Sequence, residues 1–293
     1  MGIAEKFKAL TDNLRTNDDE TISARCRRIT KRINLDFWGY DSETQHSRYL
    51  GSYGRGTDIR GHSDVDLAIQ LPWSIQTKYN AYLYKGQSVL LQAVRQSIKA
   101  TYSSTEVGGD GQVVVVQFGD GIRFEVLPVF LHSDRSFTYP DSNSGGSWKQ
   151  TNPESEINFI NAANFLYNKN VKRLARMARA WKQKNNVPIK GLLIDTFACR
   201  FMSQWLYKDK SFLYYDWMTR DFMKYLSEMD RNQSYWFALG SGERVWRVGI
   251  FEHKATQAYK TALEALEYET SNMTYSANQK WREIFGGSFP DIA

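Results

Sequence analysis

The sequence predicts an α+β protein of two lobes, in which a lobe of strands and helices is followed by a helical lobe. Before residue 131, several runs alternate apolar and polar residues at the period of two that is typical of strands. From residue 154 onward the apolar residues recur at the three-to-four spacing of helices almost everywhere. The polar, Gly- and Pro-rich stretch 132–153 separates the two patterns. We therefore expect a first lobe over residues 1–150 and a second lobe over residues 151–293.

The first lobe is expected to contain helices and strands in an interleaved order. Small and polar residues that follow Gly51-Ser52 indicate a turn, and Gly108, Gly109 and Gly111 indicate a break in the chain. Two strongly apolar runs joined across Gly119-Asp120-Gly121 predict a β-hairpin. The expected helices cover residues 3–16, about 20–37 and 74 to about 103, and the expected strands cover residues 48–50, 64–69, 113–118 and 122–130.

The second lobe is expected to be helical, with helices near residues 154–168, 170–185, 190–207, 216–229, 253–270 and 276–284. The second of these has an apolar seam that includes Val171, Leu174, Ala178 and Trp181. Lys182 flanks this seam, one turn beyond Ala178. Because a lysine can extend its ammonium group past an apolar surface, we expect Lys182 at the edge of a cleft.

The composition narrows the class of protein. A chain of 293 residues with 42% hydrophobic and 14% aromatic residues can form a sizeable core, which excludes general disorder. The net charge of +6 suits a polyanionic ligand but is equally typical of ordinary surface charge. Cys26 and Cys199 are too few for a disulfide framework or a Cys-rich zinc site. Because no apolar run approaches about 18 residues and no signal peptide is recognisable, we expect a soluble cytoplasmic protein without a membrane anchor.

A pair of carboxylates follows the Gly51-Ser52 turn. In the alternating strand around Val65, Asp64 and Asp66 point to the same face, and their Cα atoms are about 6–7 Å apart. Two carboxylates on one face can simply be the solvated side of a strand. They also repel each other unless a cation lies between them, and Mg²⁺ binds carboxylates together with the phosphate oxygens of a substrate. With the Gly51-Ser52 turn just upstream, the pair is a candidate metal site.

Glu125 is the candidate third carboxylate. It shares one face of the second hairpin strand with Arg123 and Leu127, in a run that is otherwise mostly apolar. A buried carboxylate needs a partner, because an isolated buried charge costs a large free energy. The partner is either a metal ion shared with Asp64 and Asp66 or the guanidinium group of Arg123, unless Glu125 faces solvent.

These residues resemble the nucleotidyltransferase superfamily of the polymerase-beta type, in which a Gly-Ser turn precedes an Asp-x-Asp strand and a third acidic residue lies on a later strand. The chain from about residue 20 to residue 285 looks in more detail like the bacterial CD-NTases, relatives of cyclic GMP-AMP synthase in anti-phage signalling systems. That likeness rests on four stretches: Ser63-Asp64-Val65-Asp66, Phe137-Thr-Tyr-Pro-Asp141, Gly145-Gly-Ser-Trp148 with Asn152-Pro153, and Arg179-Ala-Trp-Lys182. The resemblance implies a polymerase-beta-type nucleotidyltransferase core with a mixed sheet, packed on a helical lobe.

The resemblance implies a two-metal active site in the first lobe. Asp64 and Asp66 would hold two Mg²⁺ ions, or Mn²⁺ in their place, and Glu125 would share one ion and help to activate the attacking ribose hydroxyl. Many relatives have Asp at the third position, so Glu125 departs slightly from the pattern. Ser52 and the backbone amides after Gly51 would bind the β- and γ-phosphates.

Two further phosphate contacts are implied for the second lobe. Lys182 would contact the triphosphate, and Thr196 resembles a hydroxyl that relatives present from the next helix. Asp195 immediately precedes Thr196 in this stretch.

The resemblance also implies an activity and partners. The expected reaction joins ATP, with or without GTP, UTP or CTP, into a cyclic di- or trinucleotide second messenger in CBASS anti-phage defence. Expected partners are an effector activated by the nucleotide, accessory regulators and, through the C-terminal tail, a conjugation partner; nucleic acid is not required. Two alternatives stay open. One is linear oligonucleotide synthesis or nucleotidylation of RNA or protein, and the other is a binding module that senses nucleotide or RNA through its basic helices.

Overall fold

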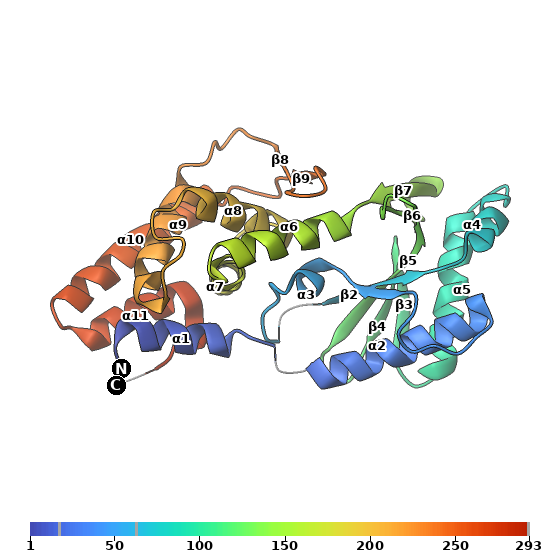
Figure 1. Ribbon diagram of the computed structural model, residues 1–293, viewed down its shortest axis with the longest axis horizontal. Coiled ribbons are helices and arrows are strands. Elements are labelled where there is room, and N and C mark those ends of the chain that lie inside the picture. Colours follow the sequence, from blue (N-terminus) through green and yellow to red (C-terminus); the bar gives the residue numbers. More distant parts are fainter. Residues whose placement is uncertain (17–18, 62–63, 292–293) are drawn as a thin grey trace. The chain divides into compact units, whose positions relative to one another are not determined.

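The computed structural model describes residues 1–16, 19–61 and 64–291 (Figure 1), so Ser63 and the last two residues of the tail lie outside the described part. The chain divides into two compact units. We call the first the sheet unit, made of Asn17–Arg55 and Gly61–Ile157. We call the second the helical unit, made of Met1–Thr16, Gly56–Arg60 and Asn158–Ala293. No helix of the described chain is both long enough and apolar enough to span a membrane.

The sheet unit is built on a seven-stranded mixed sheet. Its strands are β1 (Ser47–Tyr49), β2 (Val65–Gln70), β3 (Glu106–Asp110), β4 (Val113–Gln117), β5 (Arg123–Leu131), β6 (Phe137–Asp141) and β7 (Ser147–Thr151). The main order is β1-β2-β5-β4-β3, and β6 joins β5 to β7 at the far end of β5. Only the β2–β5 pair is parallel, whereas the other pairs of this sheet are antiparallel.

The two faces of the sheet have different chemistry. Val65, Leu67 and Ile69 point into a large apolar core that they share with helices α2 (Asp19–Ile33), α4 (Trp73–Asn80) and α5 (Gly86–Thr101) (Figure 1). The alternation of the strand places Asp66, Ala68 and Gln70 on the opposite face. That face carries only a small apolar cluster, so polar side chains can reach solvent or a ligand there.

Most expected elements of this unit are present, but four expectations were wrong. The turn after Gly51 begins as a short helix, α3 (Gly51–Arg55). The glycines near residue 110 do not break the chain, since Gly108 and Gly109 lie in β3 and pair with β4. The helix expected from 74 to 103 is interrupted between α4 and α5, where Lys85 has φ +58° and Gly86 lies against the carbonyl group of Tyr79.

The fourth difference concerns the stretch 132–153, which forms the β6–β7 hairpin rather than a loop between lobes. Its polar residues pair in the hairpin: Asp141 accepts hydrogen bonds from Asn143 and Gln112 and forms an ion pair with Lys149. The division between units therefore falls at residues 157 and 158, inside α6 (Pro153–Leu166), instead of at residues 150 and 151.

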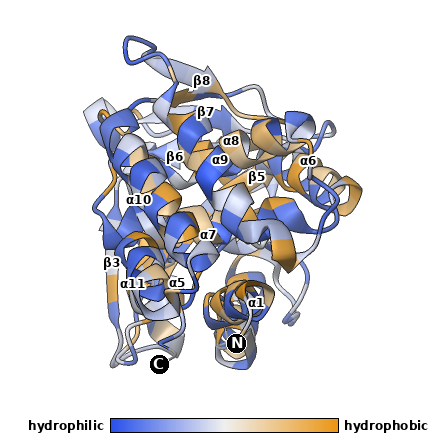
Figure 2. Cartoon of the chain, turned by 90° about the vertical axis from the view of Figure 1, so that its left-hand side faces the viewer, coloured by the Kyte–Doolittle hydropathy of each residue, from blue (hydrophilic) through white to orange (hydrophobic). Residues whose placement is uncertain are grey.

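The helical unit contains helices at all six expected places and one hairpin that the sequence did not predict. Its elements are α1 (Ile3–Asn13), the later part of α6, α7 (Asn170–Lys184), α8 (Gly191–Gln204), α9 (Tyr215–Ser227), β8 (Tyr235–Phe237), β9 (Arg244–Trp246), α10 (Glu252–Thr270) and α11 (Thr274–Phe285). Apolar and polar residues alternate around α1, as its orange and blue segments in Figure 2 show. The ring of Phe7 on α1 meets Trp281, Phe285 and Phe289 edge-on, which is why the N-terminal helix belongs to this unit.

A buried ion pair joins α7 to α8 inside the helical unit. Arg179 donates through Nη1 and Nη2 to the two carboxylate oxygens of Asp195, at 2.5 and 2.8 Å, and through Nη2 to the carbonyl oxygen of Gly191. The hydroxyl of Thr57 donates to Asp195 Oδ2 at 3.1 Å. Both members of the pair are almost fully buried. The contact from Thr57 shows how the segment Gly56–Arg60 is held in this unit.

Arg179→Ala is expected to lower the free energy of unfolding by about 3–5 kcal/mol, because it leaves the carboxylate of Asp195 buried without its cation. Urea unfolding followed by circular dichroism measures the change. Lys8→Ala, which breaks the exposed pair between Lys8 and Asp12, is the control and should change stability by less than about 1 kcal/mol. Similar losses in the two variants would contradict a special role for the buried pair.

Asp216 makes the free energy of unfolding depend on pH. Burial raises its pKa to about 6, although the backbone N–H of Trp217 donates to its Oδ1 and opposes the shift. Because the folded-state pKa lies above the unfolded value of about 3.9, stability from this group is full below about pH 4 and is lost as the pH rises through about 6. Asp216→Asn should therefore raise the free energy of unfolding by about 1–3 kcal/mol at pH 7.5, and by about a third as much at pH 4.5. The exposed Glu228→Gln serves as the control, and an equal gain at both pH values would refute the prediction.

Candidate active site

The register of the parallel pair brings two of the predicted carboxylates together. Asp66 on β2 lies directly opposite Glu125 on β5. Neighbouring strands are about 4.8 Å apart, so the two side chains leave the same face of the sheet as close neighbours. Asp64 immediately precedes β2 and is exposed. The structure thus places Asp64, Asp66 and Glu125 at one end of the β2–β5 pair.

The three carboxylates repel one another, and this repulsion affects the pKa values of Asp66 and Glu125. Burial raises the pKa of Asp66 to about 6, with further increases from Glu125 and Asp64. Burial likewise raises the pKa of Glu125, and Asp64 adds to that increase, while Arg123 opposes it. Negative charge is therefore concentrated at this end of the sheet beyond what the nearby side chains neutralise. An added cation would relieve that repulsion.

The turn at Gly51 lies directly against Asp66. Gly51 has φ +55°, and a Cβ atom at this position would fall 1.6 Å from Asp66 Oδ2. The backbone N–H of Leu50 also donates to the carbonyl oxygen of Asp66 at 2.8 Å. Only glycine leaves room for the carboxylate here, so the turn and the Asp pair form one structural element. Ser52 follows at once and is half-buried.

The donor atoms suit a hard divalent cation, but Glu125 has another partner. Carboxylate oxygens are the ligands that Mg²⁺ prefers. Arg123 donates through Nη2 to Glu125 Oε1 at 2.7 Å, so the ion pair that the sequence left open is present. Within residues 1–16, 19–61 and 64–291, no three His, Cys, Asp or Glu side chains are arranged to hold a metal ion. The three carboxylates suit a divalent cation in donor chemistry and in charge, but in this structure they are not arranged around one, and Arg123 holds Glu125.

Arg55 is a further residue of this site that sequence reasoning missed. It ends α3, is buried, and forms an ion pair with Glu156 at 3.6 Å. Its charge lowers the pKa of Asp66 and so partly offsets the effect of burial and of the other carboxylates. The available signal was a basic residue four positions after Gly51, inside a turn that has to pack closely against Asp66.

The two other predicted phosphate contacts lie in the helical unit. Lys182 is near the end of α7 and half-buried, and burial followed by the charge of Arg179 lowers its pKa. Thr196 lies on α8 and is only 2% exposed, next to the ion-paired Asp195. Their roles toward a nucleotide stay predictions.

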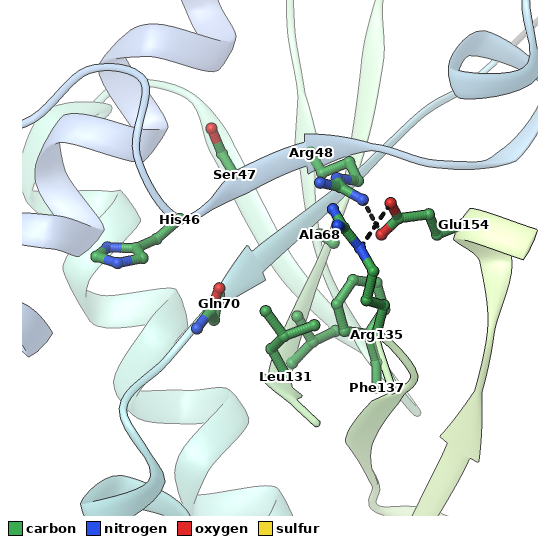
Figure 3. A pocket seen from close by; sticks show the side chains of 10 residues that line it. His46, Ser47, Arg48, Ala68, Gln70, Leu131, Arg135, Phe137 and Glu154 are labelled. Carbon is green, nitrogen blue, oxygen red and sulfur yellow. Dashed lines mark hydrogen bonds and ion pairs between the residues drawn. The ribbon is translucent and has the colours of Figure 1, made fainter. Parts of the chain in front are cut away.

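A small pocket opens on the same sheet face, further along β2 and β5 (Figure 3). Its volume is about 120 Å³, and its lining combines polar or charged side chains with apolar ones. Arg48 and Arg135 both pair with Glu154, which leaves a net positive charge among these three groups. The carboxylates of the candidate active site do not line it. The lining residues are His46, Ser47, Arg48, Ala68, Gln70, Val129, Leu131, Arg135, Phe137 and Glu154.

Comparison with solved structures identifies the fold. The chain matches Escherichia coli MS115-1 CdnC, solved with ATP, with a TM-score of 0.70 at 17% identity, covering 99% of each chain. It matches the Vibrio cholerae DncV cyclic AMP-GMP synthase, solved with the linear intermediate 5′ pppA(3′,5′)pG, with a TM-score of 0.66 at 12% identity, covering 84% of this chain and 70% of that one. These likenesses confirm the predicted α+β nucleotidyltransferase fold.

Comparison of sequences identifies the family. Residues 1–164, more than half of the chain, match the model of the Second Messenger Oligonucleotide or Dinucleotide Synthetase domain. A probable cyclic nucleotide synthase of Bacillus cereus strain VD146 is 22% identical over 277 residues, which cover 82% of this chain and 81% of the relative. The chain belongs to this synthetase family, the bacterial CD-NTases, and is a nucleotidyltransferase that makes cyclic oligonucleotide second messengers.

Gly51→Ala is expected to reduce nucleotidyl transfer at least about a hundredfold, because the added methyl group would displace the carboxylate of Asp66 and strain a backbone with positive φ. Product formation from radiolabelled ATP measures the loss. Gly119→Ala is the matched control: its Cβ atom would meet nothing within 4 Å, and its activity should stay near that of the wild type. Equal activity of the two variants would contradict the assignment of the turn.

Proposed function

We propose that Asp64, Asp66 and Glu125 are the catalytic carboxylates of this synthase and that its product is a cyclic di- or trinucleotide. The observation that carries the proposal is the pairing of Asp66 with Glu125 across two parallel strands, with the turn at Gly51 packed against Asp66. In-line attack of a ribose hydroxyl on an α-phosphate develops negative charge on the attacking and leaving oxygens, which divalent cations neutralise. Three carboxylates at one end of the β2–β5 pair are suited to hold such cations.

Each residue has a separate task in this proposal. Asp64, Asp66 and Glu125 would hold two divalent ions, Mg²⁺ or Mn²⁺, which when bound supply Lewis-acid stabilisation of the attacking and leaving oxygens. Ser52 and the backbone N–H groups that follow Gly51 bind the β- and γ-phosphates. Arg55 offsets part of the negative charge on Asp66.

Lys182 and Thr196 are proposed to contact the triphosphate from the helical unit. The half-buried ammonium group of Lys182, with its lowered pKa, favours an anionic partner. The burial of Thr196 makes it the less favoured of the two, since a phosphate has to reach its hydroxyl.

The substrates and partners are proposed from the relatives. The structures of CdnC with ATP and of DncV with a linear pppApG intermediate support ATP as a substrate and a linear dinucleotide as an intermediate. We place the reaction in the cytoplasm, in anti-phage CBASS signalling, with a downstream effector that the cyclic nucleotide activates. Accessory regulators and conjugation through the C-terminal tail belong to the same proposal.

Asp64→Asn and Asp66→Asn are expected to lower product formation by at least about a thousandfold, because each removes a charged ligand from the reacting centre. The wild type and the variants are incubated with radiolabelled NTPs and Mg²⁺ or Mn²⁺, then treated with phosphatase and analysed by mass spectrometry. Asp41→Asn, which removes an exposed carboxylate paired with Lys31 in the same unit, is the control and should keep full activity.

The state of the product separates the candidate functions. A product that resists phosphatase and has the mass of a cyclic di- or trinucleotide supports the proposal. A product that phosphatase degrades would replace it with linear transfer. Wild-type protein that makes no product but shifts labelled RNA, with a steep dependence on salt, would indicate a binding module instead.

A further inference from the structure

Arg123 and Glu125 form an ion pair within one strand of the candidate active site. They lie two residues apart on the same face of β5, and Arg123 Nη2 is 2.7 Å from Glu125 Oε1. The side chains are 33% and 26% exposed, so solvent screens the pair only in part. A hydrogen bond between two charged groups in such a place competes effectively with other ligands of the carboxylate.

The same guanidinium group has a second carboxylate within reach. Nη2 of Arg123 lies 3.9 Å from Asp110 Oδ2, at the end of β3, and Asp110 is largely exposed. The Nε atom of Arg123 is buried and has no hydrogen-bond partner in the described chain, so its contact with Glu125 does not satisfy the whole group. The guanidinium group of Arg123 thus pairs closely with Glu125 and more weakly with Asp110. A small movement of the Arg123 side chain would reverse these two pairings.

We propose that Arg123 is a positioning residue that competes with the metal ions for Glu125, and that Asp110 receives Arg123 when Glu125 turns to a metal. This inference rests on the proposed function, because it takes Glu125 as a metal ligand. The ion pair orients Glu125 in the free protein. It also weakens metal binding in the absence of substrate, since Glu125 has to leave Arg123 before it can bind a metal ion.

The proposed exchange predicts opposite changes in Mn²⁺ affinity for two substitutions. Arg123→Gln removes the competitor, and Mn²⁺ should bind about tenfold more tightly in the absence of nucleotide. Asp110→Asn removes the alternative partner, so Arg123 stays with Glu125 and Mn²⁺ binding should weaken about threefold. Both affinities are measured by electron paramagnetic resonance of free Mn²⁺ with the full-length protein and no NTP.

A double variant separates exchange from a general change in charge. If Asp110 acts through Arg123, Asp110→Asn has no effect once Arg123→Gln is present, and the double variant binds Mn²⁺ as Arg123→Gln does. If each charge acts only through its distance from the metals, the two effects add. Additive effects would overturn the proposal.

A matched control and a reference variant complete the experiment. Arg25→Gln removes a guanidinium group that pairs with Asp120 in the same unit and packs on Phe118, a residue of the apolar core of the sheet; its Mn²⁺ affinity should equal that of the wild type. If Asp66→Asn loses Mn²⁺ binding but Arg123→Gln matches the wild type, the role of Arg123 is refuted and the metal site stands. If Asp66→Asn binds Mn²⁺ as well as the wild type does, the metal site itself is refuted. Absence of Mn²⁺ binding by both the wild type and Arg123→Gln also overturns the exchange.

Discussion

The parallel pairing of β2 with β5 is the interaction on which the candidate active site depends. Because parallel strands cannot be joined by a tight turn, the chain passes through α4, α5, β3 and β4 between Gln70 and Arg123. Side chains alternate along a strand, so a shift of one residue would turn Glu125 to the other face. Phe124 and Val126, its neighbours along β5, are fully buried in the core. Their burial therefore sets the register that brings Glu125 beside Asp66.

The charges of the site follow from this packing. A carboxylate beside a packed turn and another carboxylate is unfavourable, as the raised pKa of Asp66 shows. Arg55 and Arg123 offset part of that cost, one at each carboxylate of the parallel pair. The guanidinium groups of Arg55 and Arg123 thus neutralise part of the negative charge of the three carboxylates, and an excess of negative charge remains. Binding of a further cation would therefore reduce the repulsion among the three carboxylates.

The sequence predicted the parts of the fold whose signals are local. The alternation around Asp66 and the helical spacing beyond residue 154 identified β2 and the helices α6 to α11. The hairpin β6–β7 and the strand β3 were missed because glycine and polar residues suggested loops, whereas pairing with β5 and β4 decides their structure. Asp64 and Asp66 were predicted from their spacing and Glu125 from its place in an apolar strand. The buried Arg55 was not predicted, since its ion-pair partner Glu156 lies about a hundred residues later.

The order of synthesis and the order of packing differ in the helical unit. Helix α1 is synthesised long before α11, yet the aromatic rings that cover Phe7 come from Trp281, Phe285 and Phe289. The sheet unit, which ends at Ile157, has all its residues available much earlier. During translation the apolar side of α1 therefore stays uncovered until α11 and Phe289 have been made.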